Sequence, residues 1–187
     1  MSFFTLRHLV EAVVLVVLGR HVQAAPGIFS WVKGERPSPL VQLVPLATVV
    51  ILYETFTAPL VPTLVIPGLL AFVASLTLYE WTRRTVRGKF FSYALCKDTP
   101  QFLMTAGPYA YIRNPFYASY LLAYAGALIL FPGVVMLVTF GVMFLLLVKI
   151  ARHEERKFER SKLAADYDAY RRRTGMFIPR LASAEKA

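Results

Sequence analysis

The chain has 187 residues, of which 57% are hydrophobic, and its formal net charge is +10. Its mean hydropathy of +0.52 lies far above that of soluble domains and predicts a polytopic membrane protein with a single domain. The one cysteine, Cys96, excludes an internal disulfide framework and a multi-cysteine metal site, and the cations flank apolar runs, where anionic lipid headgroups rather than nucleic acid are the expected partners.

The first apolar run, residues 3–18, is short and carries Arg7, His8 and Glu11. It fits a first transmembrane helix, an interfacial helix or the apolar part of a signal peptide. No small-x-small cleavage site follows at the expected distance, which favours a retained helix. Nothing in the sequence assigns a role to Glu11.

Two longer apolar runs, 40–56 and 59–81, follow a loop at residues 26–39. Each run approaches or exceeds the roughly 20 residues that a helix needs to cross a bilayer. The short link between them contains no lysine or arginine, which predicts a helical hairpin. Four cations within residues 83–89 stop the third run and indicate that this end is cytoplasmic.

The second half begins with a mixed, non-periodic segment, 90–115, which we expect to fold back over the membrane face. Apolar runs at 116–130 and 134–150 then predict a second hairpin, and the last helix should continue through Phe158 because no glycine or proline interrupts it. The prediction is an all-α protein with about five transmembrane helices, an external N-terminus and a cytoplasmic C-terminus. Four spans with an interfacial first helix is the alternative.

This organisation divides the single domain into two functional parts. Residues 1–81 anchor the chain in the membrane, residues 82–180 carry its polar elements at one membrane face, and the end of the chain, 182–187, is predicted to be disordered. The sequence contains no HExxH, GxSxG or GxxxxGK[ST] motif, which excludes the corresponding zinc, serine-hydrolase and P-loop chemistry.

The candidate site combines two polar elements that the apolar hairpin brings to one membrane face. In the first, Gly107-Pro108 and Asn114-Pro115 force the backbone out of helix and leave peptide groups free for a ligand. Asn114 and Pro115 are equally suited to the N-cap and first turn of a helix. Both interpretations can hold together.

The second polar element is the pair Glu154-Glu155, just beyond the last apolar run. Adjacent residues on a helix point about 100° apart, so one carboxylate can face Arg113 while the other faces outward. A solvated helix end with local ion pairs is the equal alternative. Tyr117, Tyr120 and Tyr124 form one helical stripe, which suits either core packing or the wall of a pocket.

These elements resemble the isoprenylcysteine carboxyl methyltransferase family, which is itself similar to the phospholipid methyltransferases. The resemblance covers about residues 85–179 and includes the segment 107–117, Glu154-Glu155, the 167–171 segment and the closing Ile178-Pro179. It implies an integral membrane enzyme that uses S-adenosylmethionine, with residues 82–180 as its cofactor-binding and catalytic half and a cytosolic cofactor-binding cap. It assigns catalytic roles to Arg113, Glu155 and Tyr117. It assigns cofactor contacts to Gly107, Tyr109, Tyr111, Arg113, Asn114, Pro115, Tyr117, Glu154 and Glu155.

Two departures from the family pattern are Asn114, where relatives often carry histidine, and Ser119, where they often carry glycine. The first removes an ionisable group. The implied acceptor is a lipophilic or prenylated molecule at the cytosolic face, and carboxylate O-methylation of isoprenylcysteine type is the leading expectation. The alternatives are phospholipid or amine N-methylation, an NADPH-dependent membrane reductase and a non-catalytic membrane protein. The sequence does not indicate an oligomeric state.

Overall fold

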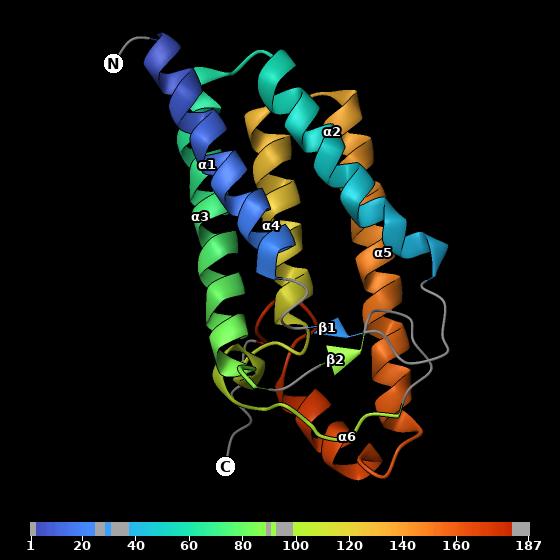
Figure 1. The fold of residues 1–187 in the computed structure, drawn as a ribbon. Coiled ribbons are helices and arrows are strands. Elements are labelled where there is room, and N and C mark those ends of the chain that lie inside the picture. Colours follow the sequence, from blue (N-terminus) through green and yellow to red (C-terminus); the bar gives the residue numbers. More distant parts are fainter. Residues whose placement is uncertain (1–2, 25–28, 31–37, 89–90, 93–98, 181–187) are drawn as a thin grey trace.

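The computed structural model describes residues 3–24, 29–30, 38–88, 91–92 and 99–180. Helices dominate this part of the chain, as the sequence predicts (Figure 1). In order, the elements are α1 (Phe3–Ala24), β1 (Phe29–Ser30), η2 (Pro39–Gln42), α2 (Leu43–Thr57), α3 (Pro62–Thr85), β2 (Phe91–Ser92), η3 (Gly107–Ala110), α4 (Pro115–Leu130), α5 (Val134–Glu159) and α6 (Ala164–Arg173).

Three helical segments of the described chain are long and apolar enough to cross a membrane: η2 with α2, α3, and α5. The helix α4 is apolar but has only 16 residues, or about 24 Å of length. The helix α1 has 22 residues but carries Arg7, Glu11 and Arg20 and is not one of the three. These findings support an integral membrane protein.

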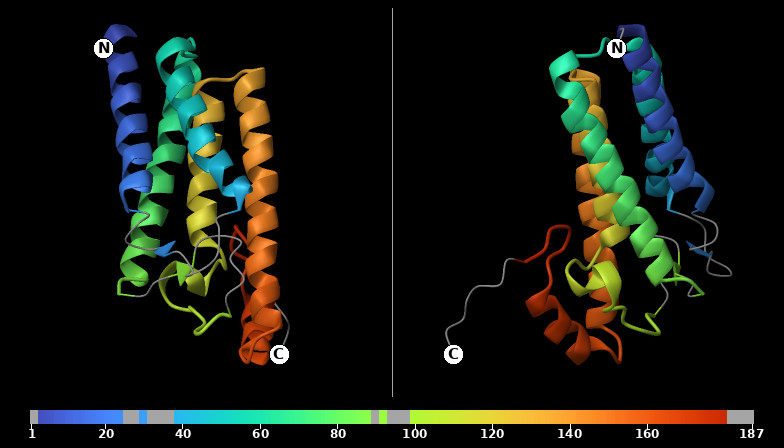
Figure 2. Two further views of the ribbon diagram at one scale, coloured as in Figure 1. Left: turned by 45° about the vertical axis from the view of Figure 1, so that its right-hand side comes forward. Right: turned by 90° about the vertical axis from the view of Figure 1, so that its left-hand side faces the viewer.

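The helices α1 to α5 alternate in direction, so the start of α1 and the end of α5 lie at opposite ends of the bundle (Figure 1). The short helix α6 lies at the same end as the C-terminal part of α5 (Figure 2). We call this end, formed by η3, the residues 99–106 before it, α6 and the residues after it, the cap. The described chain is not purely helical, because β1 and β2 pair in parallel, with Phe29 opposite Phe91.

Most helix bounds agree with the sequence prediction, and α5 continues to Glu159 as expected. The first helix differs, because it runs to Ala24 rather than ending near residue 18. Its extra residues find partners on α3: Arg20 forms an ion pair with Glu80 at 2.6 Å. The Tyr79 hydroxyl donates to the carbonyl of His21 at 3.2 Å. These tertiary contacts satisfy polar groups that the sequence pattern places beyond the apolar run.

Two glycines let α3 and α4 approach closely. A Cβ on Gly126 would lie only 3.1 Å from the carbonyl oxygen of Gly68 and 2.9 Å from the ring of Phe72. Helices in lipid gain little from the hydrophobic effect, so close packing between small residues is a main source of their association. The two helices therefore pack closely near the end of the bundle that is remote from the cap.

The polar residues of the first helix are paired. Arg7 donates from Nε to Glu11 at 3.0 Å and from Nη1 to the carbonyl oxygen of Ala58, at the end of α2, at 2.7 Å. His8 lies 2.9 Å from the second oxygen of Glu11. Glu11 thus acquires a role that the sequence did not indicate: it orients the arginine that ties α1 to the end of α2. Pairing of this kind is what ionisable groups in membrane helices require.

Several sequence predictions concern positions outside the described residues. They are most of the loop at 26–39, the inert character of Cys96 and the disordered end at 182–187. Within that loop, Phe29–Ser30 form the strand β1, which the sequence did not predict.

Candidate functional site

The segment before α4 is shaped by its glycine and prolines. Gly107 has a φ of +57°, a conformation that other residues rarely adopt, and a side chain there would overlap Thr85 at the end of α3. Pro108 is the second residue of η3, and Pro115 begins α4. Asn114 occupies the N-cap position of α4, as predicted, but its side chain makes no cap. Instead its amide nitrogen lies 3.5 Å from the carbonyl oxygen of Met176.

The tail after α6 returns to pair with this segment. Gly175 forms an isolated parallel bridge with Ile112. The backbone N–H of Arg113 donates to the carbonyl of Gly175 at 2.8 Å, and that of Gly175 donates to Tyr111 at 3.2 Å. A side chain on Gly175 would overlap the carbonyl of Ile178. This glycine therefore lets the tail turn tightly against the segment that carries Arg113.

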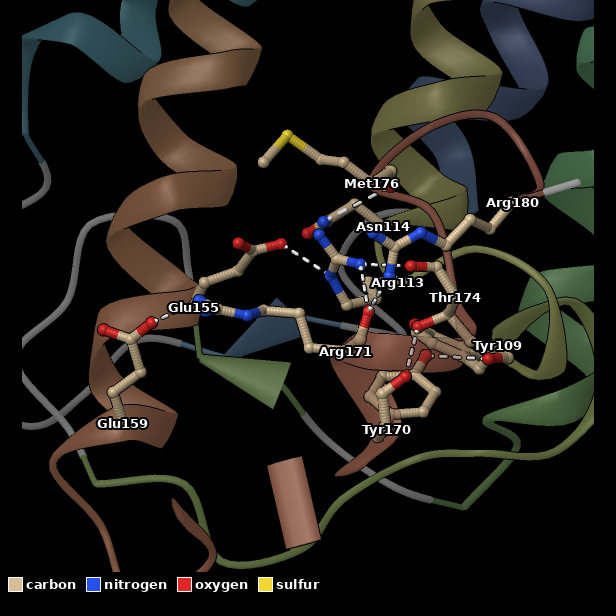
Figure 3. Close-up of polar contacts among 10 residues, drawn as sticks. All are labelled: Tyr109, Arg113, Asn114, Glu155, Glu159, Tyr170, Arg171, Thr174, Met176 and Arg180. Carbon is tan, nitrogen blue, oxygen red and sulfur yellow. Dashed lines mark hydrogen bonds and ion pairs between the residues drawn. The ribbon is translucent and has the colours of Figure 1, made fainter. Parts of the chain in front are cut away.

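Arg113, which precedes α4, connects α5, α6 and the residues after α6 (Figure 3). Its Nε donates to Oε1 of Glu155 on α5 at 2.9 Å. Its Nη1 donates to the carbonyl oxygens of Thr174 and of Arg171, the latter at 3.3 Å. Both side chains of the ion pair are only 11% exposed. Charge-assisted bonds of this kind are among the strong ones in proteins, so Arg113 fixes the end of α5 and the end of α6 relative to the start of α4.

The two glutamates take different partners. Glu155 faces Arg113, whereas Glu154 forms an ion pair with Lys157 one turn later, at 2.6 Å. Their divergence follows from the roughly 100° rotation between neighbours on a helix. Both carboxylates line the same pocket. The question that the sequence left open, which glutamate faces the Arg113 segment, is thereby answered.

A pocket opens between residues 99–104, the start of α4, the end of α5 and α6. It holds about 1060 Å³ of empty space when the part that is open to solvent is counted. Aromatic and aliphatic side chains form most of its wall. Its lining residues are Thr99, Pro100, Gln101, Phe102, Leu103, Met104, Tyr109, Arg113, Asn114, Pro115, Phe116, Tyr117, Glu154, Glu155, Lys157, Phe158, Tyr167 and Tyr170.

The structure brings most of the sequence-predicted site residues to this pocket but places two elsewhere. Tyr111 is 57% exposed and lies near Trp81, with ring centroids 6.3 Å apart. Gly107 packs against Thr85. Neither lines the pocket, and both instead shape the turn that carries Arg113. Of the tyrosine stripe on α4, Tyr117 lines the pocket while Tyr124 lies in the buried core.

Two tyrosines of α6 line the pocket although they were not among the predicted site residues. Tyr170 donates from its hydroxyl to the carbonyl of Tyr109 at 2.7 Å, and burial raises the pKa of Tyr170 to about 12. Tyr167 stacks on Phe158, with ring centroids 4.8 Å apart. The spacing of three residues, which puts both rings on one helix face, was the available signal in the sequence.

On its other side, the Arg113–Glu155 pair borders a second, more polar pocket. Its further lining residues are Asp168, Arg171, Arg172, Thr174, Gly175, Met176 and Arg180. Among them, Arg171 pairs with Glu159 at 2.7 Å and Arg172 pairs with Asp168. The Arg113–Glu155 pair is therefore a wall between an aromatic pocket and a charged one.

A comparison with protein families identifies this arrangement. The model of the phospholipid methyltransferase family matches residues 63–162, which is 100 of the 187 residues. The chain belongs to the phospholipid methyltransferase family. Membership confirms the resemblance seen in the sequence and implies methyltransferase activity in a membrane. None of the curated proteins matches the chain.

The family match covers α3, α4 and α5 and thus includes Arg113, Glu154 and Glu155. It ends before α6. Two groups of residues lie after the matched region. They are the tail residue Thr174, whose carbonyl accepts a hydrogen bond from Arg113, and the pocket-lining tyrosines Tyr167 and Tyr170. In this family member, part of the pocket wall comes from outside the matched segment.

Proposed function

We propose that this protein transfers a methyl group from S-adenosylmethionine to a lipophilic acceptor, and that the aromatic pocket holds the cofactor. The observation that carries the proposal is the Arg113–Glu155 pair, which lines this pocket and lies within the family-matched region. Its position at one end of an apolar bundle suits a reaction between a water-soluble donor and a membrane-dissolved acceptor.

The residues present fit such a cofactor. Aromatic side chains such as Phe102 and Phe158 offer surfaces for a purine ring, and the Arg113–Glu155 ion pair adds polar groups to the same lining. S-adenosylmethionine, when bound, supplies a methyl group already activated by a sulfonium charge. The protein then has to orient donor and acceptor and keep water out. Glu155 accepts hydrogen bonds from the donor, Arg113 holds Glu155 in place, and Tyr117 borders the reacting groups from α4.

The ionic groups of the pocket bear on the type of acceptor. Among the described residues that line it, Arg113 pairs with Glu155 and Lys157 pairs with Glu154, so the charges cancel. An acceptor carboxylate, as in prenylcysteine, would have to disrupt one of these pairs to gain a cation. A neutral amine does not compete for a paired cation, and Glu154 can take the proton that it releases, at the cost of the ion pair with Lys157. We therefore favour a lipid amine over the carboxylate acceptor expected from sequence.

The same proposal includes the membrane topology. Five passes, α1 to α5, place the cap and the C-terminus in the cytosol, because the cations at the end of α3 lie on the cap side. This places the cofactor pocket where S-adenosylmethionine is made available. In a Cys96→Ser background, Arg172→Cys should react with an impermeant thiol reagent only after the membrane is opened, and Gly133→Cys should react from outside. The opposite labelling would overturn this orientation.

The direct test is calorimetric titration of the purified protein in detergent with S-adenosylhomocysteine, and separately with NADPH. Binding of S-adenosylhomocysteine alone is expected. Binding of NADPH alone would establish the reductase alternative, and binding of neither by folded protein would favour a non-catalytic role.

The acceptor is then tested by transfer of labelled methyl groups to vesicles that contain phosphatidylethanolamine or a prenylated cysteine. Alkali releases methanol from a methyl ester but not from an N-methyl group, so the product distinguishes the two chemistries. Alkali-stable label in the amine lipid is the expected result. Label that alkali releases from the prenylated cysteine would restore the carboxylate acceptor.

A further inference from the structure

The hydroxyl of Tyr167 is the exception to the hydrogen bonding of the cap. Tyr167 is 3% exposed and lines the aromatic pocket. Its Oη is closed off from solvent and makes no hydrogen bond of good geometry within the described part of the chain, although the carboxylate of Glu155 is close enough to raise its pKa. Buried polar groups in native proteins nearly always have a partner, so one without calls for an explanation.

The neighbouring tyrosine shows what an ordinary buried hydroxyl does here. Tyr170, one turn further along α6, donates to the carbonyl of Tyr109 at 2.7 Å. Tyr167 lies on the same helix and is buried to nearly the same extent as Tyr170. Its ring stacks on that of Phe158, with the centroids 4.8 Å apart and 12° between the ring planes. Packing of the ring therefore explains why an aromatic residue is present, but it does not explain the hydroxyl.

The electrostatic surroundings keep this hydroxyl protonated. Burial raises the pKa of Tyr167, and the negative charge of Glu155 adds to the effect. A neutral phenol can both donate and accept a hydrogen bond. Oε1 of the nearby Glu155 is already engaged by Arg113. A ligand group at this place would thus meet a carboxylate and a phenol side by side.

We propose that the Tyr167 hydroxyl is a cofactor contact, which together with Glu155 binds a polar group of S-adenosylmethionine that carries N–H or O–H. The ammonium of the methionine part and a ribose hydroxyl both have this chemistry, since each can donate to the carboxylate while it contacts the phenol oxygen. Because solvent does not reach the oxygen, a small shift of the pocket wall accompanies this contact. The inference rests on the proposed function and adds a binding residue outside the family-matched range.

The test uses Tyr167→Phe, which keeps the stacked ring and removes only the hydroxyl, and Tyr170→Phe as its matched control. For each full-length variant in detergent, the thermal midpoint and the affinity for S-adenosylhomocysteine are measured. Tyr167→Phe should leave the midpoint unchanged or raise it, because it removes an unpaired buried group, and should weaken binding about tenfold. Tyr170→Phe should lower the midpoint, because it leaves the Tyr109 carbonyl without its donor.

A second titration, with 5′-methylthioadenosine, locates the contact. This compound keeps the ribose and lacks the amino acid. If Tyr167→Phe weakens both ligands equally, the hydroxyl meets the ribose; if it weakens only S-adenosylhomocysteine, the hydroxyl meets the ammonium. Both results support the proposal.

Two results would overturn it. Unchanged affinity for S-adenosylhomocysteine in Tyr167→Phe would remove the contact while leaving the proposed function intact. A lowered midpoint in that variant would mean that the hydroxyl is bonded within the fold. If the wild-type protein binds neither compound, the proposed function itself fails, and the cofactor contact fails with it.

Discussion

Arg113 and Glu155 stand 42 residues apart in the chain, and the Nε of the arginine donates to the carboxylate at 2.9 Å. The apolar hairpin of α4 and α5 lies between them, so the ion pair forms only when both helices are packed with their polar ends together. The same guanidinium bonds to carbonyls of the tail. The Arg113 side chain thus both lines the pocket and holds the tail in place against the end of α5.

Glu155→Gln is expected to weaken binding of S-adenosylhomocysteine at least tenfold while the protein stays folded. The amide keeps an oxygen for Arg113 but loses the charge that the cofactor contact uses. Titration calorimetry measures the effect. The matched control is Glu159→Gln, one turn later on α5, whose ion pair with Arg171 is 46% exposed on both sides and should contribute little. Equal affinities in both variants would remove Glu155 from the site.

Arg113→Ala should abolish binding and should also lower stability. The first effect follows from the place of Arg113 in the pocket wall. The structure adds the second, because the change leaves Glu155 and the carbonyl of Thr174 without their donor and removes one of the two donors to the carbonyl of Arg171. Removing one partner of a buried ion pair costs about 3 kcal/mol. A denaturant titration of the detergent-solubilised protein measures the cost, and wild-type stability would show that the tail is held by other contacts.

Gly175→Ala should detach the tail from the segment that carries Arg113. The added methyl group would overlap the carbonyl of Ile178, so the turn has to open and the backbone bond from Arg113 to Gly175 is lost. Faster proteolysis after residue 160 reports this change. Gly141→Ala on α5, where nothing lies within 4 Å of the added atom, should be neutral or stabilising by up to about 1 kcal/mol. Equal proteolysis of the two variants would contradict the tight turn.

Alkaline pH should loosen the cap before it affects the bundle. Burial raises the pKa of Tyr170 from 10.0 to about 12, so the folded cap holds this proton more tightly than the unfolded chain does. The associated stability is complete below pH about 10 and is lost as the pH rises from about 10 to about 12. Thermal midpoints and the absorbance of tyrosinate across this range test the prediction. Tyr170→Phe should flatten the pH dependence, and an unchanged slope would assign it to other groups.

The two ends of the tyrosine stripe on α4 should behave differently. Tyr117 lines the pocket, whereas Tyr124 lies in the core and is 4% exposed. Tyr117→Phe should lower the rate of methyl transfer at least tenfold, and Tyr124→Phe should leave it within about twofold of wild type. Rates are compared at equal amounts of folded protein. A large loss in Tyr124→Phe with a normal thermal midpoint would show that the pocket reaches further into the bundle.

The sequence alone predicted much of the architecture, because the signals that specify it are local. Apolar runs of bilayer length, charges at their ends and the turn residues between them mark α2 to α5 within a few residues. The prolines and glycine of the 107–115 segment act where their backbone restrictions suggest, with Pro115 in the first turn of α4 and Gly107 at positive φ. Family resemblance added Arg113 and Glu155.

Only the tertiary structure decided how the polar groups are paired. The sequence left Glu154 and Glu155 equivalent, and the packing of α4 against α5 chose Glu155 for Arg113. The tertiary structure also placed Tyr111 away from the pocket and Tyr167 in the pocket wall. In the same way, partners on α3 extended α1 to Ala24. The physical reason is that a helix pattern records which face is apolar, whereas the partner of a charge or a hydroxyl depends on which distant segment is packed against it.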